Sequence, residues 1–147
     1  MVHIANGGPS DRGPIFFNVD QPVGNGGSHN VLNADTQLVQ WMLRRLGFFG
    51  DDSMGFSGVN DQDTIDAITQ FQLANGPFPP DGKVSVAHGV TYGGSMIYTI
   101  VRLNALVRDK FRFTGWPVIN RFPNATMPPL LFSRISRLFG NDSLGDG

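Results

Sequence analysis

The chain has 147 residues and a mass of 16.0 kDa, the length of one ordinary domain, and is long enough to bury a core without disulfides. It contains no cysteine and no glutamate, since all 12 acidic residues are aspartate. The first absence excludes disulfide scaffolds, thiol nucleophiles and cysteine metal sites, and the second argues against a glycosidase, whose general acid is usually glutamate. With 40% hydrophobic residues, 16% charged residues and 19 glycines, the composition predicts a folded domain with long glycine-rich loops.

The net charge of −1 conceals an uneven distribution along the chain. Residues 1–101 carry four Lys/Arg and nine Asp, whereas residues 102–138 carry seven Lys/Arg and one Asp. Such a basic C-terminal third suits an anionic polymer or an acidic partner, and it equally fits the solvated faces of helices. We predict no nucleic-acid binding, because the basic residues are spread out and accompany no nucleic-acid-reading motif.

Residues 1–32 form a segment rich in Gly, Asn and Pro, in which only residues 14–19 have the character of a strand. Any sheet is expected to be minor, with this N-terminal segment pairing with residues 83–91. The first residues resemble no export signal, and no run approaches the roughly 18 apolar residues of a membrane span. The protein is therefore expected to be cytoplasmic, exported by a signal-independent machine, or shown without its leader.

Three amphipathic helices are predicted in the central part, residues 33–111. The first helix spans residues 35–46, is capped by Asn33 or Asp35, and ends where Gly47 takes up a left-handed conformation.

The second predicted helix spans residues 63–74, with Asn60 or Asp61 as its cap, and ends at residues 75–77, where a glycine is followed by a proline. The third, over residues 94–111, is the longest. Apolar side chains recur at helical spacing in all three, and the expected core positions are Val39, Met42, Leu43, Leu46, Ile65, Ile68, Phe71, Met96, Ile100, Leu103, Val107 and Phe111.

The C-terminal extension, residues 112–147, is basic and rich in proline and aromatic residues. A short fourth helix is predicted over residues 129–139, because proline is favourable at a first helical turn and Leu131, Ile135 and Leu138 share one face. The predicted fold class is therefore mainly α. It is a small three-helix bundle with long loops and a C-terminal extension containing a short fourth helix.

The order of the motifs resembles the peptidoglycan-binding domain family over about residues 33–107. That order is Val39-Gln40 with Leu43, then Leu46-Gly47-Phe48-Phe49, then Gly58, then Thr64 with Ala67-Ile68 and Phe71-Gln72, and finally Asp81-Gly82-Lys83-Val84. The resemblance implies a small helical bundle that binds the bacterial cell wall without catalysis.

A sugar–peptide polymer requires a shallow groove with amide and carboxylate hydrogen-bonding groups and a flat aromatic wall. The residues expected to line such a groove are Phe49, Gln72, Asn75, Asp81 and Tyr92. Some have local alternatives. Gln72 can instead satisfy neighbouring backbone groups, Thr64 can serve as a hydroxyl at a helix start, and Asp81 with Gly82 most simply makes a turn.

No catalytic site, metal site or cofactor is predicted. The three histidines are far apart and lack the spacing of zinc ligands. Asp61, Asp63 and Asp66 lack the glycine and the final acid of a calcium loop, and they fit an acidic helix start better. The sequence contains neither a nucleophile elbow nor a phosphate-binding loop.

We therefore predict a non-catalytic bacterial module that binds peptidoglycan, carried by a phage tail or a contractile secretion machine. It is expected to be cytoplasmic as made and delivered to the periplasm or cell envelope without a signal. The alternative is an adaptor or assembly protein that reuses the fold to bind a protein through residues 112–139. The residues expected to contact that partner are Arg112, Trp116, Arg121, Phe122 and Phe132. A wall-cleaving enzyme is a third hypothesis.

Overall fold

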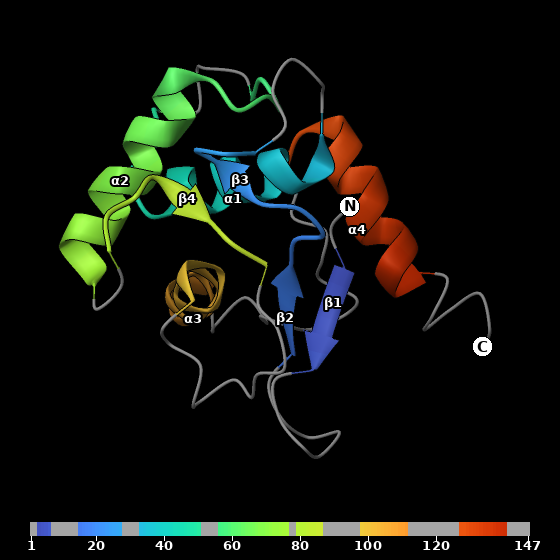
Figure 1. Cartoon of the computed structure of the whole chain (residues 1–147). Coiled ribbons are helices and arrows are strands. Elements are labelled where there is room, and N and C mark those ends of the chain that lie inside the picture. Colours follow the sequence, from blue (N-terminus) through green and yellow to red (C-terminus); the bar gives the residue numbers. More distant parts are fainter. Residues whose placement is uncertain are drawn as a thin grey trace.

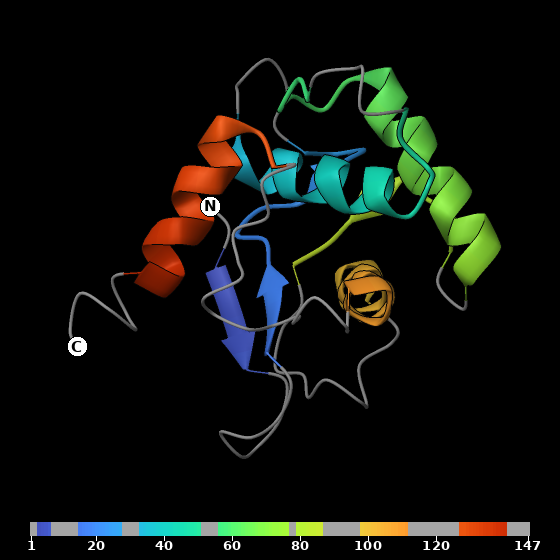
Figure 2. The same cartoon turned by 180° about the vertical axis from the view of Figure 1, so that it is seen from behind.

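The computed structural model is mainly helical. It describes residues 3–6, 15–27, 33–50, 56–76, 79–86, 98–111 and 127–140. Its helices there are α1 (Ala34–Arg45), α2 (Gln62–Asn75), α3 (Thr99–Phe111) and α4 (Pro129–Gly140), and its short strands are β1 (His3–Asn6), β2 (Ile15–Asn18), β3 (Val23–Gly24) and β4 (Lys83–Val84). Helix α1 lies in the middle, with α2 and α4 on opposite sides of it in both views (Figures 1 and 2).

Helix α1 begins and ends through local signals, as predicted, although each end lies one residue earlier. The side chain of Asn33 accepts a hydrogen bond from the Asp35 N–H at 2.6 Å and caps the first turn. At the other end Gly47 has a φ of 88°. The Gly47 N–H donates to the Arg44 carbonyl at 3.0 Å, and the Phe48 N–H donates to that of Leu43 at 2.7 Å. These two bonds form a Schellman motif, which satisfies carbonyls that the helix leaves unpaired.

Helix α2 is also capped as predicted, because the Asp61 carboxylate accepts from the Thr64 N–H at 2.9 Å. It ends at Asn75, before Gly76. Gly76 has an extended ψ of 161°, the conformation that a following proline favours in the residue before it.

The third helix is predicted to begin at residue 94, and this prediction is wrong at residue 98. Tyr98 lies in a bend, and α3 begins at Thr99; residues 94–97 are outside the described part of the chain. The Tyr98 carbonyl accepts the first helical hydrogen bonds, from the N–H groups of Val101 at 3.1 Å and Arg102 at 3.2 Å. The periodic pattern placed Tyr98 inside the helix, whereas in the structure it precedes the first turn and accepts hydrogen bonds from it. The fourth helix matches its prediction, ending one residue later.

The two small sheets confirm that the N-terminal segment pairs with the 83–91 region, since β3 pairs antiparallel with β4. The strand expected within residues 14–19 is also present as β2, and it pairs antiparallel with β1, a second sheet that the sequence did not predict. A side chain of helix α3 bonds to the backbone of β2. The Asn104 carboxamide accepts from the Phe17 N–H at 2.8 Å and donates to the Phe17 carbonyl at 2.9 Å. A buried side chain therefore fills a place that a third strand would take.

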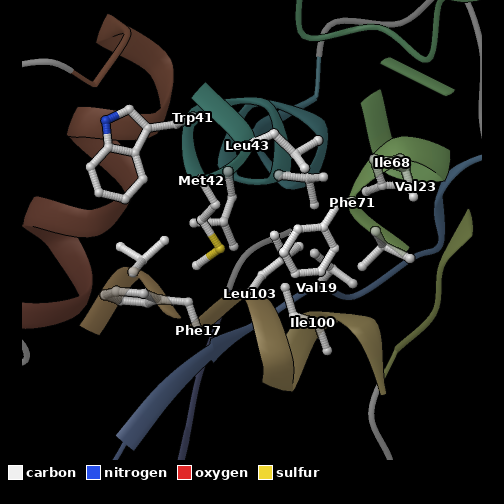
Figure 3. Close-up of a cluster of buried hydrophobic side chains, with 14 of the residues drawn as sticks. Phe17, Val19, Val23, Trp41, Met42, Leu43, Ile68, Phe71, Ile100 and Leu103 are labelled. Carbon is white, nitrogen blue, oxygen red and sulfur yellow. The ribbon is translucent and has the colours of Figure 1, made fainter. Parts of the chain in front are cut away.

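The core surrounds α1 instead of lying against one face of it. Every residue from Ala34 to Arg44 is buried, including the polar ones. Trp41 points from α1 toward α4, while Met42 and Leu43 point toward the space between α1, α2 and α3 (Figure 3). Helix α1 is thus the central helix, which a single predicted apolar face did not indicate.

The N-terminal segment and the C-terminal extension both contribute to this core. Phe17 and Val23 are buried from one side of the sequence, and Met127 and Leu131 from the other. None of the helices in the described ranges is long and apolar enough to span a membrane.

Helix α4 is held to α1 by a hydrogen bond as well as by packing. Pro128 precedes the helix and offers no side-chain cap, so a first-turn N–H must find another acceptor. The Gln37 side chain, 4% exposed, accepts from the Leu131 N–H at 3.1 Å. A glutamine of α1 therefore caps α4 from a distance.

We expect Gln37→Ala to lower the free energy of unfolding by about 1–2 kcal/mol, because it leaves the buried Leu131 N–H without its acceptor. Urea unfolding followed by circular dichroism measures the change. The control is Gln70→Ala, which removes an exposed glutamine from α2. Equal losses in the two variants would show that the cap is unimportant.

Candidate functional site

A polar hollow of about 210 Å³ is lined by residues of α2, β4 and the start of α3 and of the segments beside them. In Figure 1, α2, β4 and α3 lie on the side of the molecule away from α4. The hollow combines a carboxylate, an ammonium group, a carboxamide, three hydroxyls and one aromatic ring. Its lining residues are Gln72, Pro79, Asp81, Lys83, Ser85, Tyr98 and Thr99. We call it the Asp81–Tyr98 hollow.

The Gln72 carboxamide holds the lining of this hollow together. Its Nε2 lies 3.1 Å from the Asp81 Oδ1 and 3.0 Å from the Lys83 carbonyl oxygen. The same nitrogen lies 3.1 Å from the Thr99 Oγ1, and the Gly82 N–H donates to Gln72 Oε1 at 2.9 Å. The two hydrogens on Gln72 Nε2 thus face three acceptor oxygens, so one hydrogen is shared between two of them. Since the side chain is 2% exposed, this network fixes α2, the following turn and α3 in one arrangement.

The turn at Asp81 and Gly82 is shaped by local bonds and by the neighbouring strand β3. The Asp81 Oδ1 accepts from the Lys83 N–H at 3.0 Å, as in an Asx turn, and Gly82 has a φ of 72°. The Asn25 N–H donates to the Gly82 carbonyl at 2.9 Å. Gly24 must be glycine, because a Cβ there would collide with that carbonyl oxygen. The predicted turn at Asp81 and Gly82 is confirmed, and the strand β4 that follows it pairs with β3 of the N-terminal segment.

A second hollow, of about 350 Å³, lies elsewhere on α2 and has a different character. Its charged lining groups are both carboxylates, those of Asp63 and Asp66. The other lining residues are Phe48, Phe49, Gly50, Ala67 and Gln70. It shares no lining residue with the Asp81–Tyr98 hollow.

Phe49, one of the two aromatic residues that the sequence assigned to the groove, lies at this second hollow. It is 6% exposed and stacks on Phe56, with ring centroids 6.4 Å apart. The Arg44 guanidinium carbon lies 3.9 Å from the Phe56 ring centroid, and its Nε donates to the Phe49 carbonyl at 3.1 Å. The Phe49 ring is therefore part of a buried aromatic–arginine cluster, and it is not in the groove with Asp81.

The structure brings together two of the five predicted groove residues, Gln72 and Asp81. Gln72 is buried and positions the lining, which is the alternative expected from its place on the helix. Asn75 donates to the Phe71 carbonyl at 3.1 Å on the last turn of α2. Tyr92 lies outside the described residues.

Sequence reasoning did not select Lys83, Ser85, Tyr98 or Thr99, although all four line the hollow. Lys83 stands inside the Asp-Gly-Lys-Val motif, which indicated only a turn. Tyr98 was placed within the third helix by the predicted start at residue 94, whereas it precedes that helix. The hydroxyl-bearing Thr99 beside it carried no signal of its own.

Of the residues expected to contact a protein partner, only Phe132 lies in the described part of the chain. It is 39% exposed on α4. Arg112, Trp116, Arg121 and Phe122 fall outside that part.

The other end of α2 is held by a similar buried glutamine, Gln40 of α1. Its Nε2 donates to the Thr64 Oγ1 at 2.8 Å and to the Ser57 Oγ at 3.0 Å, and its Oε1 accepts from the Gly58 N–H at 3.0 Å. The Thr64 hydroxyl in turn donates to the Asp61 Oδ1 at 2.6 Å, so Thr64 acts at the helix start as predicted. These hydrogen bonds give the loop before α2, residues 57–61, a structural role.

Two aspartates outside the hollow have perturbed ionisation. Burial raises the pKa of Asp35, and a backbone hydrogen bond from Asp20 offsets this only in part. Burial also disfavours the charged form of Asp61, but hydrogen bonds from Thr64 and Ser57 outweigh it and lower the pKa of Asp61. Within the described ranges, no group of three acidic or histidine side chains is arranged to hold a metal ion.

Residues 33–87 match the family model described as a putative peptidoglycan binding domain. This confirms the resemblance for α1, α2 and β4, while α3 begins beyond the matched residues. A domain of this family implies a bacterial cell-wall context and supports binding to peptidoglycan. No curated protein and no solved structure matches the chain.

We expect Gln72→Ala to lower the free energy of unfolding by about 2–3 kcal/mol, because it leaves the buried Gly82 N–H and the Lys83 carbonyl without partners. Urea unfolding measures the loss, with Gln70→Ala from the same helix as the control. A loss no larger than that of the control would contradict the role of Gln72 as the organiser of this site.

Asp61→Ala should lower the free energy of unfolding by about 1 kcal/mol at neutral pH, because it removes a helix cap. Since the folded pKa of Asp61 lies below its ordinary value of 3.8, the stabilisation due to ionisation is fully present above that value. It is lost as the pH falls through the lower folded pKa.

The measurement is urea unfolding of wild type and Asp61→Ala from neutral to acidic pH. The difference between them is expected to shrink below pH 3.8. Asp35, whose pKa shifts in the opposite direction, is present in both proteins and cancels in the difference. A difference that stays constant down to the acid limit would rule out the charged cap.

Proposed function

We propose that this protein is a non-catalytic module that binds peptidoglycan through the Asp81–Tyr98 hollow. The observation that carries the proposal is the family match over residues 33–87. That stretch contains the part of the hollow contributed by Gln72, Asp81 and Lys83.

The chemistry of the lining supports the same proposal. Peptidoglycan presents sugar rings, amides and charged peptide groups. The hollow presents the Tyr98 ring, the hydroxyls of Ser85 and Thr99, and charges of both signs from Asp81 and Lys83. A concave site with one apolar wall and a few polar groups is typical of small-ligand recognition. Delivery by a phage tail or a contractile secretion machine remains a prediction.

The second candidate, an adaptor that binds a protein through its C-terminal extension, is favoured by one observation, the partly exposed Phe132. Deleting the extension would not test it cleanly, because Met127 and Leu131 belong to the core. Phe132→Ser is the better variant, since it leaves Leu131 in place. The adaptor hypothesis expects this variant to lose a protein partner while retaining wall binding.

Peptidoglycan binding is tested by cosedimentation with purified sacculi. We expect the wild-type protein to sediment with them and Tyr98→Ala to bind roughly five- to tenfold more weakly, because it loses the aromatic wall. Asp63→Asn, which changes only the other hollow, should bind as the wild type does. Sedimentation no greater than that of an unrelated domain of similar size would refute the proposed function.

A further inference from the structure

We propose that the Asp81–Tyr98 hollow recognises the charged peptide stem of peptidoglycan and not its glycan chain. This inference rests on the proposed function and names the part of the polymer that the site takes. It follows from the two opposite charges that line a single hollow, those of Asp81 and Lys83.

Both charges are available to a ligand. Asp81 is exposed and Lys83 is half-buried, and in the described part of the chain no ion pair joins them. Within the described ranges, the Asp81 carboxylate accepts hydrogen bonds from the Gln72 amide and the Lys83 backbone N–H, both through Oδ1. Among the described residues, neither side chain is paired with an opposite charge, although the two are two residues apart in a turn that Gln72 fixes.

The turn holds these charges in place before a ligand arrives. Gln72 bonds to the Asp81 side chain and to the Lys83 carbonyl, and the Gly82 N–H donates back to Gln72. The backbone that carries both charged side chains is thus fixed by one buried side chain. Such preorganisation favours binding because less freedom is lost when the ligand binds.

The chemistry of the two parts of the polymer differs in a way that matters here. Stem peptides carry free carboxylates and, at many positions, free amines, whereas the sugar rings of the chain present mainly hydroxyls and neutral amides. A neutral glycan would gain little from Asp81 and Lys83, while a peptide bearing both charges would pair with each.

The second hollow of α2 provides an internal comparison. Its charged groups are the two carboxylates of Asp63 and Asp66, so it lacks the cation that a stem carboxylate requires. Substituting Asp63 therefore changes the charge of the same helix without changing the proposed site.

The experiment is an NMR titration of the ¹⁵N-labelled full chain with two soluble probes. One is a free stem tetrapeptide, which carries both amino and carboxylate groups. The other is glycan strands from which an amidase has removed the peptides and whose freed lactyl carboxylates have then been converted to neutral amides. We expect the tetrapeptide to shift the amide signals of residues 81–85 and 98–99, and its affinity to fall as salt is added. The glycan strands are expected to shift none of these signals.

Variants then test how much each of the two charged side chains contributes to tetrapeptide binding. Lys83→Gln and Asp81→Asn should each weaken tetrapeptide binding roughly tenfold, because each removes one charged partner, while Lys83→Arg should retain most of the affinity. Asp81→Asn keeps an oxygen that can accept from Gln72 and the Lys83 N–H, so the turn is expected to survive. Asp63→Asn is the matched control and should leave the affinity unchanged.

The outcomes separate the two proposals. If the glycan strands bind and the tetrapeptide does not, the inference about the peptide stem is overturned while peptidoglycan binding stands. The same holds if the tetrapeptide binds equally well to Lys83→Gln and to the wild type. If intact sacculi also fail to bind the wild-type protein, the proposed function itself falls.

Discussion

The arrangement of this protein depends on a buried glutamine, Gln72, whose carboxamide must satisfy all its hydrogen bonds inside the protein. Removed from water, its N–H and C=O groups would each cost free energy if left unpaired. They find partners on the turn after α2 and on the first residue of α3. The position of the turn after α2 relative to the start of α3, and with it the shape of the hollow, therefore depends on one satisfied side chain.

The same physical solution recurs around the central helix. Gln40 binds the loop before α2, Gln37 caps α4, and Asn104 pairs with the backbone of β2. In each case a helix uses a buried carboxamide, with both a donor and an acceptor, to hold backbone groups of a segment that is distant or irregular. In the described part of the chain, the turns at Gly58 and Gly82 are thereby fixed to the helices, since their backbone N–H groups have defined partners.

The candidate site illustrates why sequence reasoning reached it only in part. The motif at Asp81 and Gly82 and the position of Gln72 on its helix are local signals, and both residues meet in the hollow. Phe49 had the right chemistry for an aromatic wall, but Arg44 and Phe56 draw it into a buried cluster. Tyr98 supplies the aromatic ring instead, from beyond the residues that match the family.

The sequence by itself determined the helical class, the glycine end at Gly47 and the turn at Asp81, and it narrowed each of two helix caps to two candidates, of which the structure has Asn33 and Asp61. Each of these features depends on neighbours within a few residues. Only the tertiary structure decided that α1 is buried on all sides, that β1 pairs with β2, and that α4 docks on α1. The hollow depends on a bond between Gln72 and Thr99, 27 residues apart. Such a contact leaves no periodic or local trace, since it exists only once the helices have packed.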